Sequence, residues 1–209
     1  MNSFKKVEIS SPVVSKLADL WGIYRDLEMA LKLCNIAKKF GRDNENQGLA
    51  VDGLLSAALM KYMRCFKPGL RDGLALEDLE GEGGLPDDFL VVHKHFKNYR
   101  DKHLAHSVNH YENCYINADV RVVDGVLQPI EDLLPASERV ILSNENGYAL
   151  EQLIHQVINI VVVKRHAEYP IALDAVNALG ADVIRKFEAH VPTKIDADKI
   201  HASRVKKKN

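Results

Sequence analysis

Residues 12–40 decide the fold and read PVVSKLADLWGIYRDLEMALKLCNIAKKF. Apolar residues recur in this stretch at the spacing of one helix face, namely Leu17, Leu20, Trp21, Tyr24, Leu27, Leu31 and Cys34. Ser11 and Pro12 supply a cap and a first turn. The pattern predicts a helix from about Pro12 to Phe40 whose apolar stripe belongs to a core.

Further helices are predicted on either side of a glycine-rich, acidic segment, residues 70–85, which we expect to be a connecting loop with one short turn. Before it, residues 49–66 carry small side chains that permit close helix packing. After it, Pro86 followed by two carboxylates opens another helix. A long apolar helix is expected over residues 148–166, and a final one within 171–189.

Residues 114–142 have a different character, because valine and other strand formers dominate. Asp124-Gly125 stands between Val-Val and Val-Leu, which is a strong signal for a two-residue hairpin turn. Residues 139–142 offer a further strand. The sequence therefore predicts a mainly α-helical bundle with a small β-hairpin insertion at about 114–142, whose simplest role is to cover an exposed flank.

Composition limits the possibilities. With 209 residues, 46% hydrophobic and 27% charged, the chain can form one sizeable domain, which we place at 1–190, followed by a flexible basic tail at 191–209. The net charge of −1 argues against a surface coated in positive charge for bulk nucleic-acid binding. Three widely spaced cysteines and no apolar leader or membrane span favour a cytoplasmic protein.

The stretch Tyr99-Arg100-Asp101-Lys102-His103-Leu104-Ala105-His106-Ser107 suggests chemistry. A guanidinium presents a permanent charge and a fork of donors that matches a phosphate, and an imidazole moves protons near neutral pH. At about 100° per residue, six positions separate Arg100 from His106 by about 120° around a regular helix. If both act on one phosphate, the helix must end or distort near Ala105, or a second subunit must complete the cleft.

The residues Arg100, Asp101 and His106 resemble the signature of the HEPN superfamily, in which an Arg, usually followed by a polar residue, precedes a His by a similar spacing. The resemblance is sharp over roughly residues 87–113. It implies a small antiparallel helical bundle, commonly dimeric, and often a metal-independent RNase of a toxin–antitoxin, abortive-infection or CRISPR system. One toxin subgroup carries a tyrosine two residues after the His as the target of an antitoxin nucleotidyltransferase, but Val108 stands there.

The resemblance gives each residue a role. Arg100 would clamp the scissile phosphate, His106 would transfer a proton, and Asp101 would orient one of them. Lys97, Lys102 and His103 are candidates for contacts to the RNA backbone. The expected partners are an RNA substrate, a second copy of the chain, and an antitoxin or defence-system protein. No phosphate loop or dinucleotide fingerprint is present, so we expect no cofactor.

Other interpretations of the same segment stay open. Arg100 and Asp101 can form an ordinary ion pair on a helix surface. A helix that continued past the motif would align four metal-binding side chains on one face, namely His103, His106, His110 and Cys114. The bundle can also be a HEPN-like module without cleavage activity that serves in dimerisation or partner docking.

Overall fold

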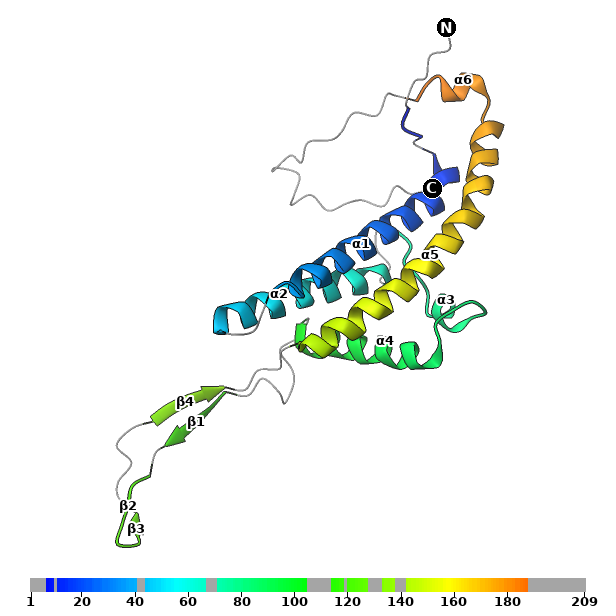
Figure 1. The fold of residues 1–209 in the computed structure, drawn as a ribbon. Coiled ribbons are helices and arrows are strands. Elements are labelled where there is room, and N and C mark those ends of the chain that lie inside the picture. The colour runs from blue at the N-terminus through cyan, green and yellow to red at the C-terminus, as the bar shows by residue number, and fades with distance from the viewer. Residues whose placement is uncertain are drawn as a thin grey trace.

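The computed structural model is mainly helical, as the apolar periodicity predicts (Figure 1). It describes residues 7–9, 11–40, 44–66, 71–104, 114–118, 120–127, 133–137 and 142–187. None of the helices in these ranges combines the length and apolar character that a membrane-spanning segment needs.

Three long helices form the body of the fold. α1 (Ser15–Ala37) follows a short 3₁₀ turn, η1 (Pro12–Val14), and packs against both α2 (Glu45–Met63) and α5 (Asn144–Ala178). α1 and α5 run in opposite directions along each other (Figure 1). Their shared core consists of fully buried side chains, including Ile23, Leu27, Val51, Leu59, Tyr62, Leu150, Leu153, Ile154 and Val157.

Local signals explain where α2 and α5 begin. The Asn44 side chain accepts a hydrogen bond from the Gln47 amide at 3.0 Å, so α2 starts earlier than the apolar pattern alone indicates. Ser143 and Asn146 form a reciprocal capping box at the start of α5. Gly147 then lets this first turn approach α2, because a Cβ there would lie 3.0 Å from the Leu55 side chain.

The segment between α2 and α5 carries the shorter helices. α2 ends in a 3₁₀ turn, η2 (Arg64–Phe66), and a single helical turn, α3 (Glu77–Glu80), lies within the predicted connecting loop. The amide of Leu85 donates to the carbonyl oxygen of Leu79 at 2.7 Å, which closes the turn before α4 (Asp87–Tyr99). α4 packs on α5 and continues into a π-helical turn, η3 (Arg100–Leu104), which contacts α2.

The prediction of two separate helices after residue 148 is wrong. α5 runs unbroken from Asn144 to Ala178 with Pro170 inside it, and in the described residues after it, which end at 187, a single turn, α6 (Ala181–Ile184), follows. A proline inside a helix costs about 3 kcal/mol because it lacks a donor and crowds the preceding turn. Packing of α5 against the start of α1 offsets this cost: Glu168 is buried and pairs with Lys16, and Ala172 is buried two residues after the proline.

One member of the predicted α1 core stripe is also misplaced. Trp21 is 45% exposed, whereas Ile23 and Ala30, outside the predicted stripe, are fully buried. The Arg165 guanidinium from α5 lies over the Trp21 ring, 3.4 Å from its centroid. The tryptophan is therefore covered by a cation on the surface and not by the core.

In the described residues between η3 and α5, four short strands are present. β1 (Cys114–Ala118) pairs antiparallel with β4 (Leu133–Ser137), and β2 (Val122–Val123) pairs antiparallel with β3 (Val126–Leu127). Asp124 and Gly125 have φ values of 48° and 79°, as a type I′ turn requires. The strand expected at 139–142 falls on residues that, apart from Leu142, lie outside the described ranges, as does the predicted basic tail.

Candidate active site

Arg100 occupies a buried position at the start of the π-helical turn. Its side chain is only 8% exposed, although arginine is a residue that normally reaches solvent. Asp101, which is half-exposed, pairs with it: the Arg100 Nη1 donates to the Asp101 carboxylate. The Arg100–Asp101 ion pair that the sequence left open is thus present, but its guanidinium is buried and not on the helix surface.

The helix changes its geometry at the motif itself. α4 ends at Tyr99, and residues 100–104 form a π-helical turn, in which the backbone is wound more widely than in an α-helix. Such turns are rare and are often found at functional sites. A distortion immediately before Ala105 is one of the two arrangements that the sequence leaves open for joint action of Arg100 and His106 on one phosphate. Ala105 and His106 themselves lie outside the described residues.

The Arg100 guanidinium is only partly satisfied. Its Nε is buried and has no hydrogen-bond partner in the part of the chain that the structure describes. Leaving a buried donor unpaired costs about 1–3 kcal/mol, and more when the group is charged. Asp101 engages Nη1, and Nε is left without an acceptor among the described residues.

A pocket of about 150 Å³ adjoins the guanidinium. Arg100, Asp101 and Lys97 supply its charged groups, and His93 supplies a further polar ring. The other lining residues are apolar and come from α2, η2 and the segment before α3, namely Met63, Phe66, Leu74 and Leu76. A cation-lined hollow with an apolar wall suits an anion that carries an apolar or aromatic group.

His93 was missed by the assignment of site residues from sequence. It precedes Arg100 by seven positions, which is nearly two full helical turns, so both side chains lie on one face of α4. Its Nδ1 is 2.8 Å from the Tyr62 hydroxyl, and its ring packs edge-to-face on Phe66 with centroids 4.7 Å apart. The seven-residue spacing is the signal that identifies it.

The electrostatic state of this pair follows from its burial. Burial, together with the charges of Lys97 and Lys94 and against the charge of Glu80, lowers the pKa of His93 to about 4. Burial also raises the pKa of Tyr62 well above its ordinary value. At neutral pH the His93 ring is therefore uncharged and the Tyr62 hydroxyl keeps its proton, so the pair is a neutral hydrogen bond beside a cationic group.

The three residues predicted to contact the RNA backbone differ in where they lie. Lys97 is exposed and lines the Arg100 pocket, as a backbone contact requires. Lys102 is exposed on the π-helical turn, and the pocket lining does not include it. His103 lies on the same turn, but its side chain is outside the described part of the chain.

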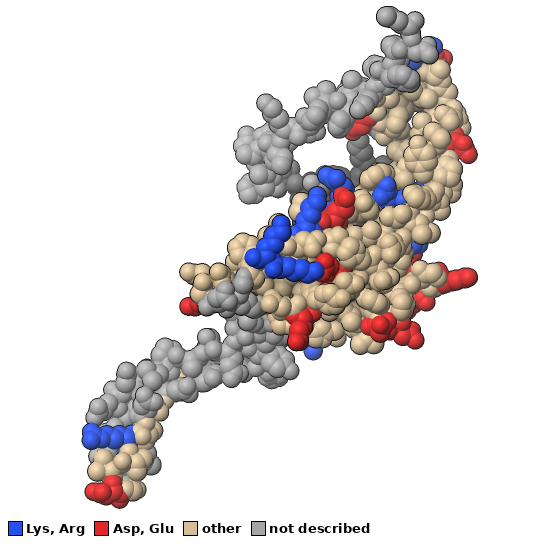
Figure 2. Space-filling model, in the orientation of Figure 1, with Lys and Arg blue, Asp and Glu red and all other residues tan. Residues whose placement is uncertain are grey.

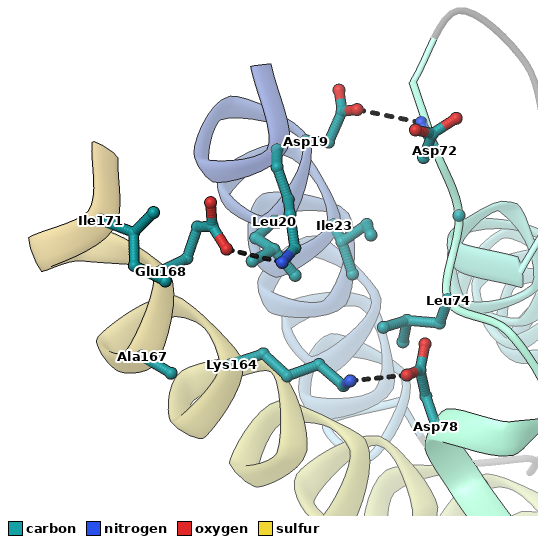
Figure 3. A pocket seen from close by; sticks show the side chains of 12 residues that line it. Asp19, Leu20, Ile23, Asp72, Leu74, Asp78, Lys164, Ala167, Glu168 and Ile171 are labelled. Atoms are coloured by element: carbon teal, nitrogen blue, oxygen red, sulfur yellow. Dashed lines mark hydrogen bonds and ion pairs between the residues drawn. The ribbon is translucent and has the colours of Figure 1, made fainter. Parts of the chain in front are cut away.

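A larger pocket, of about 430 Å³, lies between α1, α5 and the segment before α3 (Figure 3). Its charged groups face one another: Lys164 pairs with Asp78 at 2.5 Å and Lys16 with Glu168 at 2.6 Å. Asp19 accepts a hydrogen bond from the Asp72 amide at 3.0 Å. It holds none of the predicted site residues, and because its ion pairs satisfy each other it is a weaker candidate than the Arg100 pocket.

The described residues on the face drawn in Figure 2 do not present one continuous basic field. In the face drawn in Figure 2, Lys and Arg side chains gather over α1, whereas acidic side chains lie along the lower edge near α3 and α4. On that edge Lys94 pairs with Glu80 at 3.5 Å. Any anion bound near Arg100 would therefore be held by local groups and not by long-range charge.

The metal-binding interpretation required a helix that continues to Cys114. Cys114 instead begins strand β1, so the four predicted ligands do not share one helix face. Within the described ranges, no group of three or more His, Cys, Asp or Glu side chains is arranged to hold a metal ion. Cys34 and Cys65 are free and buried, and burial raises both thiol pKa values to about 12, which makes them unreactive.

Comparisons with known proteins add no assignment: no protein-family model matches the chain, and no curated protein or solved structure matches it.

Proposed function

We propose that this protein is a metal-independent endoribonuclease of the HEPN type that cleaves RNA at a site containing Arg100, Asp101 and His106, and that it works in the cytoplasm in phage defence or a toxin–antitoxin system. A second copy of the chain would complete the cleft. The proposal combines the motif resemblance with the surroundings of Arg100.

One observation carries the proposal. Arg100 is buried beside a pocket with its Nη1 fixed by Asp101 and its Nε unpaired. An arginine fork binds phosphate through two parallel hydrogen bonds, and such charge-assisted bonds are about twice as strong as neutral ones. A phosphate oxygen at Nε would accept a hydrogen bond from the unpaired donor. Binding of a phosphodiester would therefore remove the free-energy cost of leaving this donor unpaired.

The proposed reaction is an internal transfer. The ribose 2′-oxygen attacks the adjacent phosphorus as its proton passes to a base, and the bond from phosphorus to the 5′-oxygen breaks as that oxygen takes up a proton. The products are a 2′,3′-cyclic phosphate and a free 5′-hydroxyl. His106 performs a proton transfer, and Arg100 stabilises the negative charge that grows on the phosphate oxygens. Asp101 keeps the guanidinium in place.

The test is cleavage of a mixed RNA pool in EDTA, followed by mapping of the new ends. Wild-type protein should cut and leave cyclic phosphates. Arg100→Lys keeps the charge but loses the fork, and His106→Ala loses the proton carrier. Both variants should therefore cut at roughly one hundredth of the wild-type rate or below it. Arg25→Lys is the matched control, because Arg25 is 75% exposed on α1 and should cut as the wild type does.

Two results would contradict the proposal. Cleavage at the wild-type rate by both variants would remove the assigned roles, and cleavage that EDTA abolishes would point to a metal-dependent enzyme. If each variant unfolds at the same temperature as the wild type, its loss of activity does not come from a loss of structure.

A non-catalytic docking module is the second candidate. Large apolar side chains on α5 are exposed, with Val163 at 68% and Ile171 at 61%, as a surface for a protein partner would be. Intact RNA with every variant, together with self-association of the wild type that Val163→Glu disrupts, would favour this module over the nuclease.

A further inference from the structure

The pocket beside Arg100 has more apolar wall than a phosphate needs. Phosphate oxygens seek donors and cations, yet half of the lining side chains are apolar: Met63, Phe66, Leu74 and Leu76. These residues come from two segments of the chain, the end of α2 with η2 and the segment before α3, so the wall is a product of the tertiary fold and not of one helix.

An aromatic ring, that of Phe66, lines the pocket. Phe66 is partly buried, and its ring is fixed by edge-to-face contacts with Tyr62, at 5.1 Å between centroids, and with His93, at 4.7 Å. A ring held in this way loses little conformational freedom when a ligand arrives, which favours binding. Nucleobases stack on such rings whatever their sequence, because every base has a π-face.

A neutral polar group completes the wall. His93 lines the pocket and uses Nδ1 in its contact with Tyr62, so Nε2 is the ring nitrogen that remains for a ligand. Because Tyr62 is buried, this partner fixes the position of the imidazole. An uncharged imidazole nitrogen matches the donors and acceptors along the edge of a base.

The size of the pocket limits what can enter. At about 150 Å³ it is well below the roughly 300–1,000 Å³ of sites for drug-sized molecules. It therefore suits one planar ring next to a bound phosphate, and not a folded RNA element or a dinucleotide.

We infer that the Phe66–His93 side of the pocket is a binding site for a single nucleobase, whose own phosphate lies on Arg100. This rests on the proposed function and extends it: the enzyme selects RNA by an unstacked base at the cleavage point. A base can enter this pocket only if it is neither stacked on nor paired with other bases. Single-stranded segments are therefore the substrate, and base-paired segments are excluded.

The experiment compares ligands that differ only in the base. Wild-type protein is titrated calorimetrically with adenosine and uridine 5′-monophosphates and with ribose 5-phosphate, none of which can be cleaved. At least one nucleotide should bind about tenfold tighter than ribose 5-phosphate, equal to about 1.4 kcal/mol, which lies within the range measured for stacking of one base.

Two variants locate the effect. Phe66→Leu keeps an apolar side chain but removes the ring, and should abolish the preference for nucleotide over ribose 5-phosphate. Phe40→Leu is the matched control, because Phe40 is a 43% exposed aromatic outside this pocket, and should keep the preference. The wild-type comparison needs no variant, so it decides the matter even if Phe66→Leu fails to fold.

The outcomes separate this inference from the proposed function. Equal binding of nucleotide and ribose 5-phosphate, both lost in Arg100→Met, would overturn the base site and leave the phosphate site intact. A preference that survives Phe66→Leu would also overturn it. Absence of any binding would contradict the phosphate clamp and the base site together.

Discussion

Two buried charged residues in this protein differ in how fully their charges are paired. Asp26 on α1 is 12% exposed and is surrounded by three cations: Lys61 at 3.2 Å, Arg64 at 3.8 Å, and Arg71, which makes a short hydrogen bond to it. Arg100 is 8% exposed and has one carboxylate partner and an unpaired Nε. Asp26 therefore has three cationic partners, whereas Arg100 has one carboxylate partner and a donor without an acceptor.

The pKa of Asp26 shows what full pairing does. Burial alone would raise it, but hydrogen bonds from Arg71 and Lys61 and the charge of Arg64 lower it below the ordinary value of 3.8. Asp26 thus ties α1 to α2 and to the segment after η2, which is a structural task. Arg100 has no comparable set of partners in the described part of the chain, and this contrast supports the proposal that a ligand binds there.

The largest expected effect is on Asp26. Asp26→Asn removes the charge while three cations stay in place, and should destabilise the fold by about 3–5 kcal/mol, as measured when one partner of a buried ion pair is deleted. Urea unfolding at neutral pH measures the loss. Asp182→Asn, at a 92% exposed ion pair, should change the free energy of unfolding by less than about 0.5 kcal/mol. Equal values for both variants would remove the structural role of Asp26.

Arg100 should behave in the reverse manner. Arg100→Met keeps a long side chain and deletes the unpaired donor, so unfolding should change by no more than about 1 kcal/mol, while RNA cleavage falls roughly 100- to 1,000-fold. The urea and cleavage assays together measure this. A loss of several kcal/mol of stability would mean that Arg100, like Asp26, is structural.

The lowered pKa of His93 predicts that the folded protein loses stability as the pH falls. Its pKa falls from 6.5 to about 4 on folding, so the unfolded chain binds a proton first as the pH drops. Its contribution to stability is therefore complete above pH 6.5 and is lost on the way to pH 4, on the order of 3 kcal/mol. His93→Gln does not titrate, so its stability should fall less than that of the wild type across this range.

The matched control is His95→Gln, two residues away on the exposed face of α4. It should unfold with the acid sensitivity of the wild type, since His93 is unchanged. Identical pH profiles for wild type and His93→Gln would show that the imidazole is not held neutral in the pocket.

The smallest effect concerns the turn that leads into α4. A Cβ on Gly84 would lie 2.3 Å from the carbonyl oxygen of Leu79, so Gly84→Ala must shift the turn and should cost about 1–3 kcal/mol. Gly48→Ala, in α2 with no atom within 4 Å of the added carbon, should instead stabilise by about 0.5–1 kcal/mol. Thermal unfolding distinguishes the two, and a Gly84→Ala protein as stable as wild type would contradict the close approach.

Local patterns in the sequence predict most of the helices. Three- and four-residue apolar spacing locates α1, α2 and the first half of α5, and Asp124-Gly125 marks a turn with positive φ angles. Local patterns fail where a distant partner decides: Pro170 stays helical because Glu168 and Ala172 pack against the start of the chain, and Trp21 leaves the core because Arg165 covers it.

The candidate site divides in the same way. Arg100 and Asp101 are visible in the sequence because they are adjacent within a motif, but the pocket beside them is also lined by α2, η2 and the segment before α3, which no local pattern contains. His93 is placed by helical periodicity, whereas its pairing with Tyr62 joins residues 31 positions apart. Periodicity predicts which side chains share a face, and only the fold decides what covers them.

The most direct test of the contrast is the proton resonance of the arginine Nε–H groups, followed by NMR as uridine 5′-monophosphate is added. Arg100→Lys and Arg71→Lys assign the two signals. The Arg100 Nε–H should move downfield and exchange more slowly with water as a phosphate oxygen engages it, while that of Arg71, beside Asp26, stays still. A stationary Arg100 signal at saturating nucleotide would contradict the claim that this buried arginine binds phosphate.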